Sequence, residues 1–133
     1  MIKTILCIDD DPITLMLCKK VITKVSFSEE IIFASNGQEA YELLKKLCLD
    51  KDLGNVPNLI FLDLNMPVMN GWEFLDSIES DLKNNLKDTK VIILSSTIDP
   101  SDYNKAKQYE MVSHFLSKPI TVDMLENLKP IYS

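Results

Sequence analysis

The sequence predicts an α/β domain with a five-stranded parallel sheet and helices on both faces. Five short, strongly apolar segments recur along the chain, and each is followed by a stretch with helical features. Strands that alternate with helices imply a parallel sheet, because parallel neighbours need crossover helices. The chain has 133 residues and contains no repeat or Gly/Ser linker, which fits a single domain.

The apolar segments are nearly continuous, as is typical of strands that are buried on both faces. The expected strands are Thr4–Ile8, Glu30–Ser35, Leu59–Leu62, Lys90–Ser95 and Ser113–Leu116. Two helices are expected to begin at Asp-Pro pairs, Asp11-Pro12 and Asp99-Pro100, with Asp as the cap and Pro in the first turn. The others follow Asn36, begin at Gly71, or span Thr121–Leu128.

Helical spacing of apolar residues supports the assignment of these helices. Apolar residues recur at this spacing at Ile13, Leu17, Val21 and Val25 in the first helix, at Ala40, Leu43, Leu44 and Leu47 in the second, and at Trp72, Leu75 and Ile78 in the third. In the third helix this spacing predicts that the apolar residues point inward. The connections Leu49–Pro57 and Ser80–Thr89 are longer than such a domain needs, and tolerated insertions are favoured over partner contacts.

Composition excludes several classes of function. The net charge of −6 disfavours nucleic acid and anionic membranes as partners. The three glycines are too widely spaced for a phosphate-binding loop, and a histidine zinc site or a Ser-His-Asp triad would depend on His114 alone. The three cysteines form no CxxC motif and are typical of reduced thiols in a cytosolic protein. The N-terminal apolar run is too short for a signal peptide or a membrane span.

Polar residues follow the strands at the edge where a parallel sheet binds its ligands. The first strand ends at Asp9–Asp11, the third at Asp63, the fourth at Ser95 and the fifth just before Lys118. Neighbouring carboxylates repel one another and need a cation, and oxygen ligands with room for water suit Mg²⁺. With a lysine and a hydroxyl added, these groups make a phosphoryl-transfer site in which a carboxylate can be the acceptor.

Five motifs in this order resemble the receiver domain of two-component response regulators, of the single-domain, chemotaxis-regulator-like kind. These motifs are Ile8-Asp9-Asp10-Asp11-Pro12, Leu62-Asp63-Leu64-Asn65-Met66-Pro67, Met69-Asn70-Gly71, Ile93-Leu94-Ser95-Ser96 and Phe115-Leu116-Ser117-Lys118-Pro119. Each motif is weak alone, but the match covers the whole chain. The resemblance implies a flavodoxin-like (βα)5 three-layer sandwich with strand order 2-1-3-4-5, the order known for chemotaxis regulators.

The resemblance assigns a metal site and an acceptor. It implies that Asp63 accepts the phosphoryl group and that the cofactor is Mg²⁺. The ion would be bound by the carboxylates of Asp10 and Asp63 and by the backbone carbonyl of Asn65, while Asp9 acts mainly through water. Asn65, together with Thr97, would tune the lifetime of the phosphate.

The resemblance also implies a switch. Lys118 would pair with Asp63 at rest and with the phosphoryl oxygens afterwards. Ser95 would donate its hydroxyl to the phosphoryl group, and Phe115 would fill the space that Ser95 vacates. Ser96 is a second candidate for the hydroxyl role, and Ser95 is preferred because it follows Ile93-Leu94. In this family the bond between Lys118 and Pro119 is usually cis.

The function implied is a stand-alone response regulator over residues 1–133, with no output domain. A sensor histidine kinase or a histidine phosphotransfer protein would supply the phosphoryl group, and the chain would catalyse only its own phosphorylation and dephosphorylation, so it is not expected to be an enzyme. We expect a cytoplasmic protein that is a monomer or a weak dimer, with a protein as its downstream target and no nucleic acid or membrane as partner.

Two other classes remain open. A phosphatase of the haloacid-dehalogenase type also uses an Asp nucleophile, but it needs a second acid two residues on, where this chain has Asn65. A receiver-like adaptor that binds partners without phosphorylation would not need the carboxylate cluster. Taken singly, Asp9–Asp11 could be a helix cap, Lys118 a surface lysine and Phe115 a plain core residue.

Overall fold

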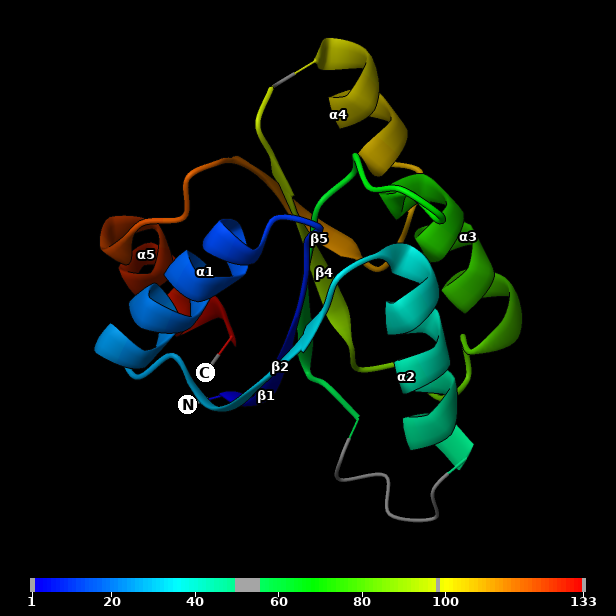
Figure 1. The fold of residues 1–133 in the computed structure, drawn as a ribbon, viewed down its shortest axis with the longest axis horizontal. Helices are drawn as coiled ribbons and strands as arrows, with labels where there is room; N and C mark the ends of the chain where they lie inside the picture. The colour runs from blue at the N-terminus through cyan, green and yellow to red at the C-terminus, as the bar shows by residue number, and fades with distance from the viewer. Residues whose placement is uncertain (1, 50–55, 98, 133) are drawn as a thin grey trace.

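A computed structural model describes residues 2–49, 56–97 and 99–132 of the chain (Figure 1). Strands and helices alternate throughout these residues. In chain order they are β1 (Ile2–Ile8), α1 (Pro12–Lys24), β2 (Ser28–Ala34), α2 (Gly37–Leu49), β3 (Leu59–Leu62), α3 (Gly71–Asp81), β4 (Lys90–Ser95), α4 (Pro100–Ala106), β5 (Val112–Ser117) and α5 (Val122–Tyr132). The strands form one parallel sheet in the order β2-β1-β3-β4-β5, which confirms the predicted class and strand order.

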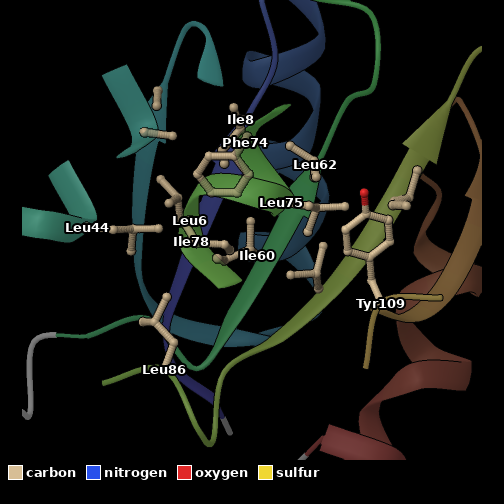
Figure 2. Close-up of a cluster of buried hydrophobic side chains, with 14 of the residues drawn as sticks. Leu6, Ile8, Leu44, Ile60, Leu62, Phe74, Leu75, Ile78, Leu86 and Tyr109 are labelled. Carbon is tan, nitrogen blue, oxygen red and sulfur yellow. The ribbon is translucent and has the colours of Figure 1, made fainter. Parts of the chain in front are cut away.

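The sheet is the middle of three layers. Helices α1 and α5 cover one face, and α2, α3 and α4 lie on the other (Figure 1). Each face carries its own cluster of buried apolar side chains, because strands buried on both sides contribute alternate residues to each face. Figure 2 shows the cluster beneath α2 and α3, in which Phe74 and Leu75 of α3 pack against Ile60 and Leu62 of β3.

The helices begin where capping residues predict. The Asp11 Oδ1 atom accepts a hydrogen bond from the Ile13 N–H at 3.0 Å, and Asp99 Oδ1 accepts one from the Ser101 N–H at 2.9 Å. Asn70 and Glu73 form a reciprocal capping box at the start of α3. These caps fix the direction in which the chain leaves the carboxyl edge of the sheet.

Two helices show features that the sequence pattern does not specify. The apolar residues Ile13 and Leu17 of α1 are 74% and 37% exposed, because the side of α1 that packs on the sheet is formed by Cys18, Val21 and Ile22. Helix α5 continues to Tyr132, four residues beyond the expected end. The Tyr132 hydroxyl bonds to Ser113 and to His114 Nδ1, the latter at 2.6 Å, and these contacts tie the last turn to β5.

The long connection Ser80–Thr89 is packed rather than loose. Leu82 and Leu86 are buried in the cluster beneath α2 and α3, and the buried Thr89 hydroxyl donates to the Pro57 carbonyl at 2.7 Å. Of the other long connection, Leu49–Pro57, residues 50–55 lie outside the described residues. Among the helices of the described ranges, none combines the length and the apolar character that crossing a membrane requires.

All three cysteines are free thiols, as the sequence predicts. Cys7 on β1 and Cys18 on α1 are both buried between the sheet and that helix, whereas Cys48 on α2 is half-buried. A hydrogen bond with Cys18, together with burial, raises the pKa of the Cys7 thiol. The pair therefore belongs to the core beneath α1 and α5.

Candidate functional site

The candidate site lies at the carboxyl ends of β1, β3, β4 and β5. Backbone bonds continue the sheet ladder one residue past two of these strands: the Asp9 N–H donates to the Ala34 carbonyl at 3.1 Å, and the Asp63 N–H donates to the Ile8 carbonyl at 3.0 Å. Because β1 and β3 are neighbours with Ile8 opposite Leu62, these bonds bring Asp9 and Asp63 side by side.

Three carboxylates gather there, as the sequence predicts. One oxygen each from Asp9, Asp10 and Asp63 lies within 4.8 Å of the other two. Asp9 and Asp63 are only 4% and 6% exposed, while Asp10 is exposed. Burial, and then the neighbouring charge of Asp9, raise the pKa of Asp63. Such a set of oxygen ligands, open to solvent on the side of Asp10, fits a hydrated Mg²⁺ ion.

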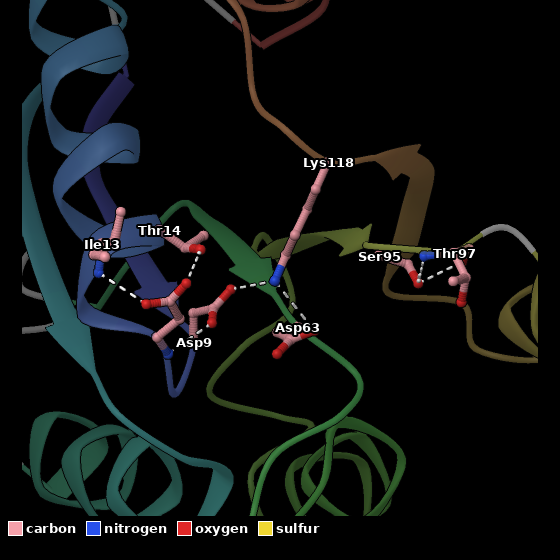
Figure 3. Close-up of polar contacts among 8 residues, drawn as sticks. Asp9, Ile13, Thr14, Asp63, Ser95, Thr97 and Lys118 are labelled. Atoms are coloured by element: carbon pink, nitrogen blue, oxygen red, sulfur yellow. Dashed lines mark hydrogen bonds and ion pairs between the residues drawn. The ribbon is translucent and has the colours of Figure 1, made fainter.

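Lys118 reaches between the two buried carboxylates (Figure 3). Its Nζ atom lies 2.6 Å from Asp9 Oδ2 and 3.4 Å from Asp63 Oδ1. Burial alone would lower the pKa of Lys118, but the hydrogen bond to Asp9 and the charge of Asp63 raise it overall. The side chain is placed by the end of β5, where the Lys118 N–H donates to the Ser95 carbonyl at 2.8 Å and the bond to Pro119 is cis.

Asp9 makes structural contacts that the sequence did not predict. Besides its ion pair with Lys118, its Oδ1 atom accepts a hydrogen bond from the Asp11 N–H at 2.9 Å. The carboxylate therefore joins β5 to the start of α1. Its position directly after a buried strand next to β3 is the signal that could have indicated this role.

The Ser95 hydroxyl is bonded within its own loop. Ser95 is 2% exposed, and its Oγ atom donates to the Thr97 carbonyl at 2.5 Å and accepts from the Thr97 N–H at 3.3 Å. Ser96 and Thr97 are exposed. Of the two neighbouring serines, Ser95 is therefore the one whose hydroxyl is buried at the end of β4.

Phe115 lies half-buried on β5, opposite Ile93 of β4. Its ring meets the ring of Tyr103 edge-on, with centroids 6.0 Å apart and planes at 69°. The ammonium group of Lys107 lies 4.6 Å from the centroid of the Tyr103 ring. A hollow of about 220 Å³ adjoins these side chains between α4 and β5. Sequence reasoning missed Tyr103, because only the fold brings α4 onto Phe115.

The loop Asn65–Asn70 closes the site on the side of α3. The Gly71 N–H donates to the Leu64 carbonyl at 2.9 Å, and a Cβ atom at Gly71 would lie 2.7 Å from the Asp63 carbonyl oxygen. Only glycine allows α3 to begin this close to Asp63. The Asn65 N–H bonds to the Asp63 carboxylate, which counters part of the rise in the pKa of that group.

A family comparison defines the class of this site. The family model described as the response regulator receiver domain matches residues 5–128. The chain therefore belongs to the response regulator receiver domain family, and its fold is the predicted flavodoxin-like sandwich. A receiver domain of a response regulator implies two-component signalling. Receiver domains are generally phosphorylated by histidine kinases or phosphotransfer proteins and bind Mg²⁺ at an acidic pocket of this kind.

Individual relatives agree with this assignment. A two-component response regulator from Cytophaga hutchinsonii is 34% identical, with a TM-score of 0.89 over 98% of this chain and 96% of that one. The two-component response regulator ARR17 of Arabidopsis thaliana is 35% identical over 94% of this chain and 81% of its own length. Vibrio cholerae chemotaxis protein CheY4, 21% identical with a TM-score of 0.78 over the whole of both chains, shows the shared fold.

Other relatives are longer proteins. An uncharacterized response regulatory protein of Staphylococcus epidermidis is 33% identical over 98% of this chain but 46% of its own length. The nitrate/nitrite response regulator NarL of Escherichia coli is 41% identical over 56% of this chain and 31% of its own length. The chain thus spans half or less of the length of these relatives.

Proposed function

We propose that the chain is a phosphorylation-controlled switch in which Asp63 accepts a phosphoryl group from a histidine of a partner protein. The observation that carries the proposal is the cluster of Asp9, Asp10 and Asp63 on a receiver fold, with the Lys118 ammonium group paired to Asp9 and Asp63. The carboxylates of Asp10 and Asp63 and the Asn65 backbone carbonyl would hold Mg²⁺, and Asp9 would act through water. The ion would neutralise charge on the transferred group.

The transfer itself needs little more than positioning. An oxygen of the Asp63 carboxylate forms the new bond to phosphorus, while the bond between phosphorus and the donor's imidazole nitrogen breaks and its electrons stay with the imidazole. Lys118, already held at the site, then pairs with the phosphoryl oxygens. Hydrolysis of the acyl phosphate later restores Asp63, at a rate that Asn65 and Thr97 tune. The chain therefore acts on its own carboxylate and not on an independent substrate.

The switch would begin at Ser95. When the phosphoryl group is present, the Ser95 hydroxyl leaves Thr97 and donates to a phosphoryl oxygen. Phe115 then moves into the vacated space and gives up its edge-on contact with Tyr103. Phosphorylation of Asp63 would thereby change the shape of the surface that α4 and β5 form.

The proposed phosphoryl donor is a sensor histidine kinase or a histidine phosphotransfer protein. Helix α1 begins next to the carboxylate cluster (Figure 3), and three of its apolar side chains are exposed. Ile13 is 74%, Met16 58% and Leu17 37% exposed. A protein donor that approaches Asp63 can bury these side chains, whereas a small donor cannot.

The downstream target would be a protein that binds the surface formed by α4, β5 and α5. The protein would act in the cytoplasm, as a monomer or a weak dimer, without nucleic acid or membrane as a partner.

Intact mass after incubation with Mg²⁺ and a small acyl-phosphate donor tests the proposal. We expect one phosphoryl adduct that is absent without Mg²⁺ and absent from Asp63→Asn. An adduct that survives in Asp63→Asn would refute the assigned acceptor. No adduct in the unsubstituted protein, with Mg²⁺ binding shown separately, would favour a phosphorylation-independent adaptor.

A further inference from the structure

The loop between β3 and α3 contains a strained turn. Val68 has a backbone φ of 69°, a conformation that β-branched residues rarely adopt. The Met69 N–H donates to the Pro67 carbonyl at 2.8 Å, only two residues back. A positive φ enclosed by such a bond makes a γ-turn of the rare, strained kind. Because the Val68 side chain is 79% exposed, its own packing does not offset this strain, and the loop must be held by contacts elsewhere.

The first turn of α2 supplies one such contact. The Gly37 N–H donates to the Met69 carbonyl at 3.1 Å, at the residue that closes the γ-turn. A Cβ atom at position 37 would lie 2.6 Å from this carbonyl oxygen and 2.9 Å from Met69 Cγ, closer than real Cβ atoms approach. Helix α2 and the loop can therefore meet in this way only because residue 37 has no side chain.

The other end of the loop rests on the candidate acceptor. Gly71 bonds to the Leu64 carbonyl and leaves no room for a Cβ atom beside the Asp63 carbonyl oxygen. Asn65, whose backbone carbonyl is a proposed Mg²⁺ ligand, lies between this anchor and the one at Met69. The segment that carries the proposed ligand is therefore held at both of its ends, at Leu64 by Gly71 and at Met69 by Gly37.

We infer that Gly37 is a positioning residue for the metal site, which holds the strained loop Asn65–Asn70 so that the Asn65 carbonyl faces Asp63. This inference rests on the Mg²⁺ binding of the proposed function. It extends the site to α2, a helix that supplies none of the proposed ligands.

Calorimetric titration with Mg²⁺ alone tests the inference without phosphorylation. Gly37→Ala is expected to weaken Mg²⁺ binding roughly tenfold, as is usual when the support of a metal ligand is lost. The matched control Gln38→Ala, in the same turn, should stay within about twofold of the unsubstituted protein, since Gln38 bonds to Glu42 of its own helix. Urea unfolding without Mg²⁺ separates this effect from a loss of folding.

The variant Val68→Gly tests the part played by strain. Glycine adopts a positive φ without cost, so the loop should then need less support from α2. We expect the penalty of Gly37→Ala to fall to about twofold or less in the Val68→Gly background. An equal penalty in both backgrounds would overturn the role of strain.

The outcomes distinguish this inference from the proposed function. An unsubstituted protein that binds no Mg²⁺ contradicts the proposed function itself. Mg²⁺ binding that is unchanged in a folded Gly37→Ala variant overturns the positioning role alone. If that variant does not fold, the NMR amide signal of Gly37 in the unsubstituted protein tests the positioning role instead. It should shift with the same half-saturating Mg²⁺ concentration as the signal of Asn65, and a signal that does not move contradicts the inference.

Discussion

Lys118 lies closer to Asp9 than to the proposed acceptor Asp63, at 2.6 Å against 3.4 Å. The shorter contact thus goes to the carboxylate that is not the proposed acceptor. Asp63 lies farther from the ammonium group, and its pKa is raised. Asp63 is therefore the less well compensated of the two buried carboxylates, which favours the approach of a second cation.

Replacing Lys118 with methionine should separate metal binding from phosphorylation. Lys118→Met keeps the unbranched shape and most of the length of the side chain but removes a cation that competes for Asp9 and Asp63, so Mg²⁺ should bind more tightly. The phosphoryl adduct formed from a small donor should fall by roughly 100-fold, the usual cost of losing one group that stabilises developing charge. Calorimetry and intact mass measure the two effects. Lys83→Met, at an exposed lysine, is the control, and an undiminished adduct in Lys118→Met would refute the role.

Stability should depend on pH through Asp63. Its pKa is raised in the folded protein, so the native state binds the proton more readily than the unfolded chain, and this contribution to stability is lost as pH rises through the folded pKa. Asp63→Asn should therefore raise the free energy of unfolding at neutral pH by about 1 kcal/mol. The gain should shrink as pH falls and Asp63 becomes protonated. Urea unfolding over a pH series measures this, with the exposed Asp88→Asn as control; a gain that grows toward low pH has the wrong sign.

Removing the Ser95 hydroxyl should separate phosphorylation of Asp63 from the movement of the Phe115 ring. Ser95→Ala should still form the adduct on Asp63, but it lacks the hydroxyl that is proposed to draw the end of β4 toward the phosphoryl group. The NMR signals of the Phe115 and Tyr103 rings should then change little on phosphorylation. Ser96→Ala, at the exposed neighbour, should respond as the unsubstituted protein does. Full ring shifts in Ser95→Ala would show that another group carries the signal.

The exposed face of α1 should distinguish protein donors from small ones. Met16→Lys places a charge among apolar side chains that a protein donor would bury. Transfer from a phosphorylated histidine phosphotransfer protein should fall roughly tenfold, equivalent to about 1.4 kcal/mol, while labelling by a small acyl phosphate stays unchanged. Thr23→Lys, at the other end of α1, is the matched control. Equal loss with both donors would point to damage at the site instead of a docking surface.

Much of the fold could be predicted because the local signals agree with the global structure. The apolar strands, the Asp-Pro helix starts and the polar residues after β1 and β3 all indicate one parallel sheet with its site at one edge. The gathering of Asp9, Asp10 and Asp63 follows from the neighbouring positions of β1 and β3, a strand order that the family resemblance implied and that local signals did not.

What could not be predicted depends on contacts between distant segments. The repeat of Ile13, Leu17 and Val21 fits a helix, but periodicity does not show which part of that row the sheet covers. The edge-on contact of Tyr103 with Phe115 needs the placement of α4 on β5, and its residues carry no motif. The close approach of Gly37 to Met69 likewise depends on how α2 packs beside the loop.

The ion pair of Asp9 and Lys118 joins positions 109 residues apart. During synthesis the acidic cluster of β1 and β3 is made long before the lysine that completes it, and domains form as their chain emerges from the ribosome. A nascent chain that lacks β5 therefore has the carboxylates of Asp9 and Asp63 but not the lysine that pairs with them. The charge arrangement of the candidate site is thus completed only when β5, at an edge of the sheet, has been made and has joined β4.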